Sequence, residues 1–140
     1  MLAPLHLTQM AIPAMRERKQ GWVLMMTSVG GERIEGPPFS EFDTTAGFGV
    51  YGTVKAALSR LTQSLAAELY ADGIAVNAAA PSNPVATPGA GTLDLAKTDT
   101  EDISLITETA FLLCTGDPAT LTGRVAHTQP FLREMGLLTS

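Results

Sequence analysis

The chain has 140 residues, with 9 Lys and Arg against 14 Asp and Glu and a formal net charge of −5. This length suits one domain, and 45% hydrophobic residues with 16% charged residues are enough to form a core, which excludes wholesale disorder. The acidic balance argues against nucleic-acid binding, because phosphate backbones are bound by clustered cations. A single cysteine, no secretory leader and no apolar run long enough to span a bilayer favour a cytoplasmic location.

The first half of the chain predicts two helices separated by a strand and a long loop. Apolar spacing and a basic last turn favour a helix over residues 2–19. The continuous apolar run 22–26 predicts a strand buried on both faces. Residues 29–48 are rich in Gly, Pro, Ser and Thr and lack periodicity, which indicates a loop. Leucines at three- and four-residue spacing predict a helix over residues 49–71.

The second half of the chain continues the alternation of strands and helices. A short apolar run predicts a strand over residues 74–78, and the Pro- and Gly-containing residues 82–101 predict a loop that could act as a substrate lid. An apolar stripe favours a helix over residues 102–115, and residues 123–128 form a last strand candidate before an apolar-containing tail at 131–138. The order α-β-α-β-α-β predicts an α/β fold with a parallel sheet covered by helices.

Tyr51 and Lys55 stand four residues apart near the start of the second long helix, so their side chains leave the same face. A lysine ammonium within about 4–6 Å stabilises a phenolate, and such a tyrosine can act as a general acid or base near neutral pH. The pair alone is a common coincidence, and an exposed tyrosine beside a solvated lysine is its ordinary explanation. The surrounding segments therefore decide how it is interpreted.

Two further segments flank this pair. A strand ends at Thr27-Ser28 upstream, and the run Val76-Asn77 leads to Pro81 downstream. Together with the Tyr51 and Lys55 helix, they resemble the short-chain dehydrogenase/reductase family from its fourth crossover helix to its C-terminus. The resemblance covers most of the chain and implies a partial, Rossmann-like, doubly wound parallel sheet.

The resemblance also implies roles for individual residues. It implies that Tyr51 is the catalytic acid/base and that Lys55 favours the phenolate of Tyr51 and binds the nicotinamide ribose. It also implies that Ser28 hydrogen-bonds the reacting oxygen of the substrate. The segment expected to line the nicotinamide contains Pro81, Val85 and Thr87. The implied cofactor is NAD or NADP, the substrate is a small carbonyl or alcohol, and the two long helices resemble those of the family's dimer interface, so a homo-oligomer is expected.

The chain departs from the family's pattern in its loops. Ser28 and Tyr51 are 23 positions apart, about twice the family's common spacing, so residues 32–48 look like an insertion at the substrate mouth. Three aromatic side chains in or beside it either line an apolar substrate pocket or fasten the loop to the core: Phe39, Phe42 and Phe48. Ser82 stands where the family usually has glycine, and His127-Thr128-Gln129 replaces a common Asp-Gly-Gly turn. These changes bear on the local backbone and on any cofactor contact that it makes.

The family's cofactor-binding half, with its glycine-rich turn, is expected to precede Met1, so residues 1–140 are interpreted as one truncated domain with an exposed strand edge. Gly47, Gly49 and Gly52 match a dinucleotide fingerprint by spacing, but no strand precedes them and the match is rejected. These glycines are expected to let the loop turn into the helix.

Other chemistries and functions are weighed against this one. Ser28 lacks the glycine of a nucleophile elbow, His6 and His127 lie far apart without ligand-spaced partners, and Cys114 sits on an apolar stripe as a core residue. Hydrolase, metal and redox-thiol chemistry are therefore not indicated. Two alternatives stay open: the chain is a non-catalytic remnant or interaction module, or the same fold and Tyr-Lys pair serve epimerisation or dehydration.

Overall fold

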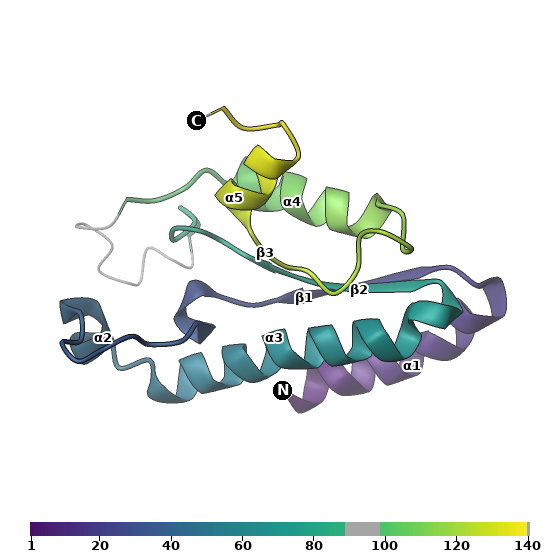
Figure 1. Ribbon diagram of the computed structural model, residues 1–140, viewed down its shortest axis with the longest axis horizontal. Helices are drawn as coiled ribbons and strands as arrows, with labels where there is room; N and C mark the ends of the chain where they lie inside the picture. The colour runs from purple at the N-terminus through teal and green to yellow at the C-terminus, as the bar shows by residue number, and fades with distance from the viewer. Residues whose placement is uncertain (89–98, 140) are drawn as a thin grey trace.

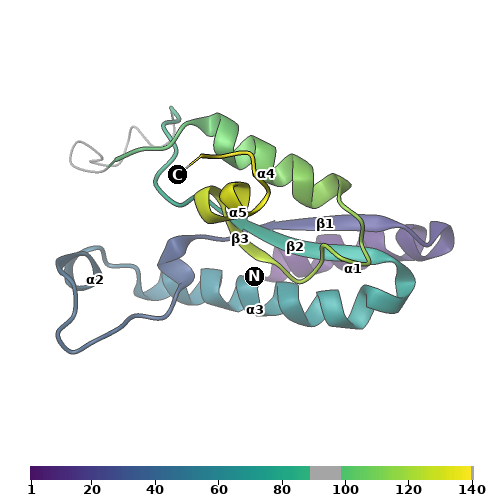
Figure 2. The same ribbon diagram turned by 45° about the horizontal axis from the view of Figure 1, so that its top comes forward.

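The computed structural model describes residues 1–88 and 99–139. Its centre is a parallel sheet in the order β1-β2-β3, formed by β1 (Gly21–Met26), β2 (Ile74–Ala80) and β3 (Val125–His127). Helices α1 (Leu2–Arg18) and α3 (Gly49–Leu69) run along one face, and α4 (Ile103–Thr115) and α5 (Thr128–Glu134) cover the other (Figures 1 and 2). This arrangement confirms the predicted α/β fold and parallel sheet.

Helix α3 forms where the leucine spacing predicts it. Its buried side chains follow one stripe, which faces the sheet: Leu58, Thr62, Leu65, Ala66 and Leu69. Full burial of each leucine stabilises the fold by about 1.5–3 kcal/mol. A short 3₁₀ turn, η2 (Tyr70–Asp72), continues the helix, and Gly73 then adopts a φ of 71°, a left-handed conformation that favours glycine. The predicted helix and its stop signal are confirmed.

Strand β2 is the centre of the core, since all seven of its residues are buried. It is longer than the predicted run 74–78 because the alanines that follow also pair, and the ladder couples Met26 to Ala79 and Ala80 to His127. The small side chains of Ala79 and Ala80 let the helices of both faces approach the sheet closely. The parallel register brings the carboxyl ends of all three strands to one edge.

Two segments differ from the sequence-based expectation, because their helices are too short to produce a recognisable apolar pattern in the sequence. The predicted loop 29–48 contains a 3₁₀ turn, η1 (Val29–Gly31), and a five-residue helix, α2 (Glu41–Thr45). Helix α2 begins where Ser40 accepts a hydrogen bond from Asp43 N at 3.1 Å. A helix of one turn cannot establish a visible hydrophobic period. The same reason explains the tail, because the predicted strand 123–128 pairs only over β3 and the chain then enters α5.

The prediction that the first strand is buried on both faces is wrong. Only Gly21 and Met25 of β1 are buried, and Met26 is 44% exposed. In the part of the chain that the structure describes, β1 pairs with β2 alone and borders an apolar groove of about 510 Å³ between α1 and α3. Among the described residues, β1 is therefore an edge strand of the sheet.

The predicted loop 82–101 lies partly outside the described residues, which omit 89–98. Its two described ends meet at a parallel bridge between Val85 and Glu101. No helix within the described ranges is long and apolar enough to cross a bilayer.

Candidate active site

The candidate site lies at the carboxyl edge of the sheet. Thr27 N donates to Ala79 O at 2.8 Å, so the chain leaves β1 at Ser28 beside the point where it leaves β2 at Pro81. In a parallel sheet, this edge is where loops of different strands come together and where ligands bind. The structure thus brings the predicted catalytic and cofactor-binding segments to one edge.

Tyr51 and Lys55 share the sheet-facing side of the first turns of α3. The Lys55 ammonium lies 5.6 Å from the centre of the Tyr51 ring, and it donates a hydrogen bond to Met26 O at 2.8 Å. An ammonium has three donors, so two N–H groups stay available beyond the bond to Met26. The Tyr51 side chain is 45% exposed, and its hydroxyl has no hydrogen-bond partner among residues 1–88 and 99–139.

Ser28 is joined to the same group through the turn η1. Its hydroxyl accepts a hydrogen bond from Gly30 N at 3.2 Å and so caps the turn, which leaves the hydroxyl proton able to donate. A Cβ at Gly30 would lie 3.4 Å from the Tyr51 ring. The turn therefore places Ser28 on the backbone that directly borders Tyr51.

The three glycines around Tyr51 differ in what the structure requires of them. A Cβ at Gly52 would collide with the carbonyl oxygen of Gly30, so glycine lets η1 approach α3. Gly47 turns the chain into the helix with a φ of 65°. A Cβ at Gly49 would meet nothing within 4 Å. Only Gly52 of the three is needed for close packing beside the candidate site.

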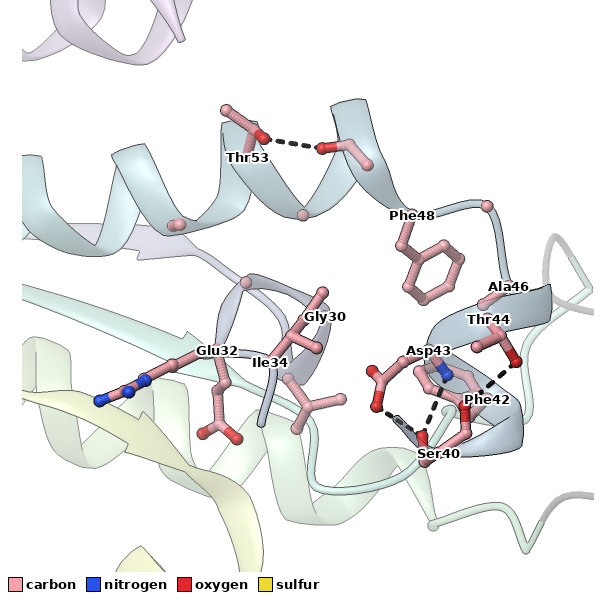
Figure 3. A pocket seen from close by; sticks show the side chains of 17 residues that line it. Gly30, Glu32, Ile34, Ser40, Phe42, Asp43, Thr44, Ala46, Phe48 and Thr53 are labelled. Carbon is pink, nitrogen blue, oxygen red and sulfur yellow. Dashed lines mark hydrogen bonds between the residues drawn. The ribbon is translucent and has the colours of Figure 1, made fainter. Parts of the chain in front are cut away.

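The loop between β1 and α3 borders a half-open cavity of about 680 Å³ on the η1 side of α3. Phe42 and Phe48 line it, whereas Phe39 is not among its lining residues. Figure 3 shows the Phe48 ring pointing into the space between η1 and α2. The Phe42 and Phe48 ring centres lie 5.4 Å apart, and those of Phe48 and Tyr51 lie 5.1 Å apart. An unbroken row of aromatic rings thus connects the cavity wall to Tyr51.

One contact at this edge has no counterpart in the sequence-based interpretation. His127 Nε2 lies 2.8 Å from a carboxylate oxygen of Glu32, so the end of β3 is tied to the start of the inserted loop. The two residues are far apart in the chain and belong to no motif. Only the tertiary structure could have revealed this pair.

The three residues expected to line the nicotinamide follow β2 directly. Pro81, Val85 and Thr87 are half-buried on the segment that leaves the strand.

Cys114, expected in the core, is only half-buried, and partial burial raises the pKa of its thiol. A raised pKa lowers the fraction of reactive thiolate near neutral pH.

Comparison with known proteins identifies relatives for most of the chain. A family model described as short chain dehydrogenase matches residues 1–97. Oxidoreductase UcpA of Salmonella typhimurium is 35% identical over 105 residues, which are 75% of this chain and 36% of that protein. A crystal structure of the TT0495 protein of Thermus thermophilus superimposes with a TM-score of 0.71 at 29% identity, over 93% of this chain and 56% of that one.

A structure that holds a nicotinamide coenzyme is also similar. The 3-oxoacyl-(acyl-carrier protein) reductase of Brucella melitensis with bound NAD has a TM-score of 0.66 at 25% identity, over 89% of this chain and 45% of that one. The chain thus spans about a third of the curated relative and about half of the two solved chains. These similarities confirm the partial Rossmann-like sheet, and the family match over residues 1–97 shows that the chain belongs to the short-chain dehydrogenase family.

Proposed function

We propose that the protein is an NAD- or NADP-dependent oxidoreductase that interconverts a small carbonyl compound and an alcohol, with Tyr51 as the acid/base. The single observation that carries the proposal is the grouping of Ser28, Tyr51 and Lys55 at the carboxyl edge of the sheet, with the Tyr51 hydroxyl unpaired among the described residues. These residues fit a coenzyme and a substrate, because the exposed Tyr51 phenol and the Lys55 ammonium, which uses one of its three donors, both lie at the carboxyl edge of the sheet.

The reduced coenzyme, when bound, supplies a hydride to the carbonyl carbon. Tyr51 gives its hydroxyl proton to the carbonyl oxygen, so the product is a neutral alcohol and the tyrosine is left as a phenolate. The Lys55 ammonium stabilises that phenolate, because an opposite charge nearby favours the ionised form. Its remaining N–H donors suit a ribose hydroxyl. Ser28 donates to the carbonyl oxygen and orients it, while its own oxygen is held by Gly30 N.

Pro81, Val85 and Thr87 complete the proposed site as residues that line the nicotinamide. Their position directly after β2 supports this role, since coenzymes bind outside the carboxyl ends of strands in such sheets. Phe42 and Phe48 are proposed to shape the substrate side through their row of rings to Tyr51. The inserted loop 29–48 is thus assigned to the substrate side of the site, and the described residues 82–88 to its nicotinamide side.

The proposal includes a cytoplasmic homo-oligomer. Helices α1 and α3 expose large apolar side chains, which favours burial against a second copy: Leu2, Leu7, Met10, Val50 and Val54. Light scattering of the purified protein should give a mass above that of one chain. A clean monomer at micromolar concentration would contradict the oligomer and leave the catalytic proposal in place.

The catalytic proposal is tested on the protein expressed from its own gene with a C-terminal tag. Oxidation of NADH and NADPH is measured with a panel of small ketones and aldehydes, for the wild type and for Tyr51→Phe. Loss of the general acid should lower turnover by about 100-fold or more. Tyr70→Phe is the matched control, because it removes a hydroxyl that bonds Ala119 O, at the far end of α3. Full activity of Tyr51→Phe, or no coenzyme binding by the wild type, would overturn the proposal.

A further inference from the structure

The segment that leaves β2 is held by a buried carboxylate. Glu101 is 4% exposed, although it is ionisable and stands only two positions before α4. A charged group at this depth needs hydrogen-bond donors to offset its lost hydration. The Thr128 hydroxyl lies 2.9 Å from both carboxylate oxygens, and Asn83 N donates to one of them at 3.3 Å. The side chain thus ties the start of α5 to the segment after β2.

The backbone of Glu101 binds the same segment. Its N–H donates to Pro84 O at 2.9 Å, and its carbonyl accepts from Ala86 N at 3.4 Å, which forms the bridge with Val85. Side chain and backbone together contact four consecutive residues, 83–86. These residues include one that is proposed to line the nicotinamide.

Ser82 and the first turn of α5 meet at Thr128, the residue that holds this carboxylate. Ser82 N donates to Thr128 Oγ1 at 2.9 Å, the two hydroxyl oxygens lie 3.1 Å apart, and Gln129 N donates to Ser82 Oγ at 3.1 Å. Thr128 has one hydroxyl proton and the carboxylate can only accept, so this proton is directed to Glu101. Ser82, Thr128 and Glu101 therefore form one hydrogen-bond network, in which bonds between the residues offset the hydration that each polar group loses on burial.

We infer that Glu101 is a positioning residue for the coenzyme: its buried carboxylate, held by Thr128 and Asn83, fixes residues 82–86 in the conformation that binds the nicotinamide. The inference rests on the proposed function. Glu101 itself contacts no reacting atom and acts through the backbone of the segment. Weakening the network therefore lowers the affinity for coenzyme, while the proton transfer by Tyr51 proceeds as before once coenzyme is bound.

The test compares Glu101→Ala and Glu101→Gln with Glu108→Gln, in the protein expressed from its own gene. Glu108 is an exposed residue of α4, so its variant makes the same change of charge outside the network. Binding of NADH and NADPH is titrated, and kcat is measured at saturating coenzyme. Hydrogen exchange of the peptide that covers residues 82–88 is measured without coenzyme.

The expected result is a split between binding and turnover. Glu101→Ala should raise the coenzyme Kd roughly tenfold and speed exchange of the 82–88 peptide, with kcat within about threefold of the wild type. Glu101→Gln retains an acceptor for Asn83 or Thr128, so it should restore part of the affinity. Glu108→Gln should match the wild type in every measurement.

The outcomes separate this inference from the proposed function. If the wild type binds neither coenzyme, the proposed function fails and the inference fails with it. If the wild type binds coenzyme and both Glu101 variants bind it equally well, the positioning role alone is overturned. If Glu101→Ala does not fold, Glu101→Gln decides: an unchanged Kd together with unchanged exchange of the 82–88 peptide contradicts the role.

Discussion

The ammonium group of Lys55 donates a hydrogen bond to the carbonyl oxygen of Met26 at 2.8 Å. Met26 is the last residue of β1, and Lys55 lies in the second turn of α3. The bond therefore fixes the cation against the sheet, 5.6 Å from the centre of the Tyr51 ring. A charge that is oriented in advance stabilises a developing phenolate without having to reorganise.

Replacement of Lys55 should abolish most of the turnover. Lys55→Met removes the charge that stabilises the phenolate and keeps the apolar stem, so we expect turnover to fall by about 100-fold or more with the fold retained. Arg60→Met is the matched control, since it removes an exposed cation from the same helix. Turnover of Lys55→Met within threefold of the wild type would exclude the proposed role.

Two glycines of α3 should respond in opposite ways to alanine. A Cβ at Gly52 would collide with Gly30 O and push η1 away, so Gly52→Ala should lower the free energy of unfolding by about 1–3 kcal/mol. Turnover should fall as well, because η1 borders Tyr51. Gly49→Ala meets open space and should be neutral or stabilise the helix by up to about 1 kcal/mol. Urea unfolding measures both, and equal effects would show that the Gly30 contact is unimportant.

Asn77 should be among the most sensitive positions of the core. Its fully buried amide donates to Leu121 O at 2.9 Å and accepts from Arg124 N at 3.0 Å, which fastens the approach to β3 onto β2. Asn77→Leu would leave both backbone groups without these partners, so we expect a loss of about 3 kcal/mol. A loss below about 1 kcal/mol in urea unfolding would mean that water or a backbone shift replaces the amide.

Thr109 offers a stabilising substitution. Its side chain is fully buried on α4, and its hydroxyl has no hydrogen-bond partner within residues 1–88 and 99–139. Thr109→Val keeps the branched shape and removes the unpaired oxygen, so the free energy of unfolding should rise by about 1 kcal/mol. Thr62→Val is the matched control, because that equally buried hydroxyl donates to Leu58 O at 2.9 Å and its removal should bring no gain. A thermal midpoint of Thr109→Val below that of the wild type would contradict the expectation.

Asp102 should contribute to the fall in stability at acid pH. It is the N-cap of α4, and hydrogen bonds from the side chain and the backbone N–H of Ser104 lower the pKa of its carboxyl below the ordinary value of 3.8. A carboxyl with a lowered folded pKa stabilises the fold above the unfolded pKa, and this contribution is lost as pH falls through the folded pKa. Asp102→Asn keeps a capping oxygen without a titrating group.

Thermal midpoints of both proteins across the acid range test this assignment. The wild type should lose more stability than Asp102→Asn as pH falls below about 4. If the thermal midpoints of the two proteins fall equally with pH, protonation of the Asp102 carboxylate does not affect the stability of the fold.

Local patterns in the sequence determined the long elements and the Tyr51–Lys55 pair. The leucine stripe of α3 and the apolar run of β2 repeat over several turns or residues, so period and length are visible without any tertiary contact. The i, i+4 spacing places Tyr51 and Lys55 on one helix face for the same reason. The short elements α2 and α5 were missed because one or two turns of helix carry too little periodic signal.

Only the tertiary structure decided which groups meet at the carboxyl edge of the sheet. Lys55 bonds Met26, His127 pairs with Glu32, and Glu101 reaches Thr128, each across a long stretch of chain. None of these pairs has a spacing that a helix or strand repeats, so the sequence contains no local trace of them. They exist because parallel strands bring their carboxyl ends to one edge, where loops from distant parts of the chain must satisfy one another's polar groups.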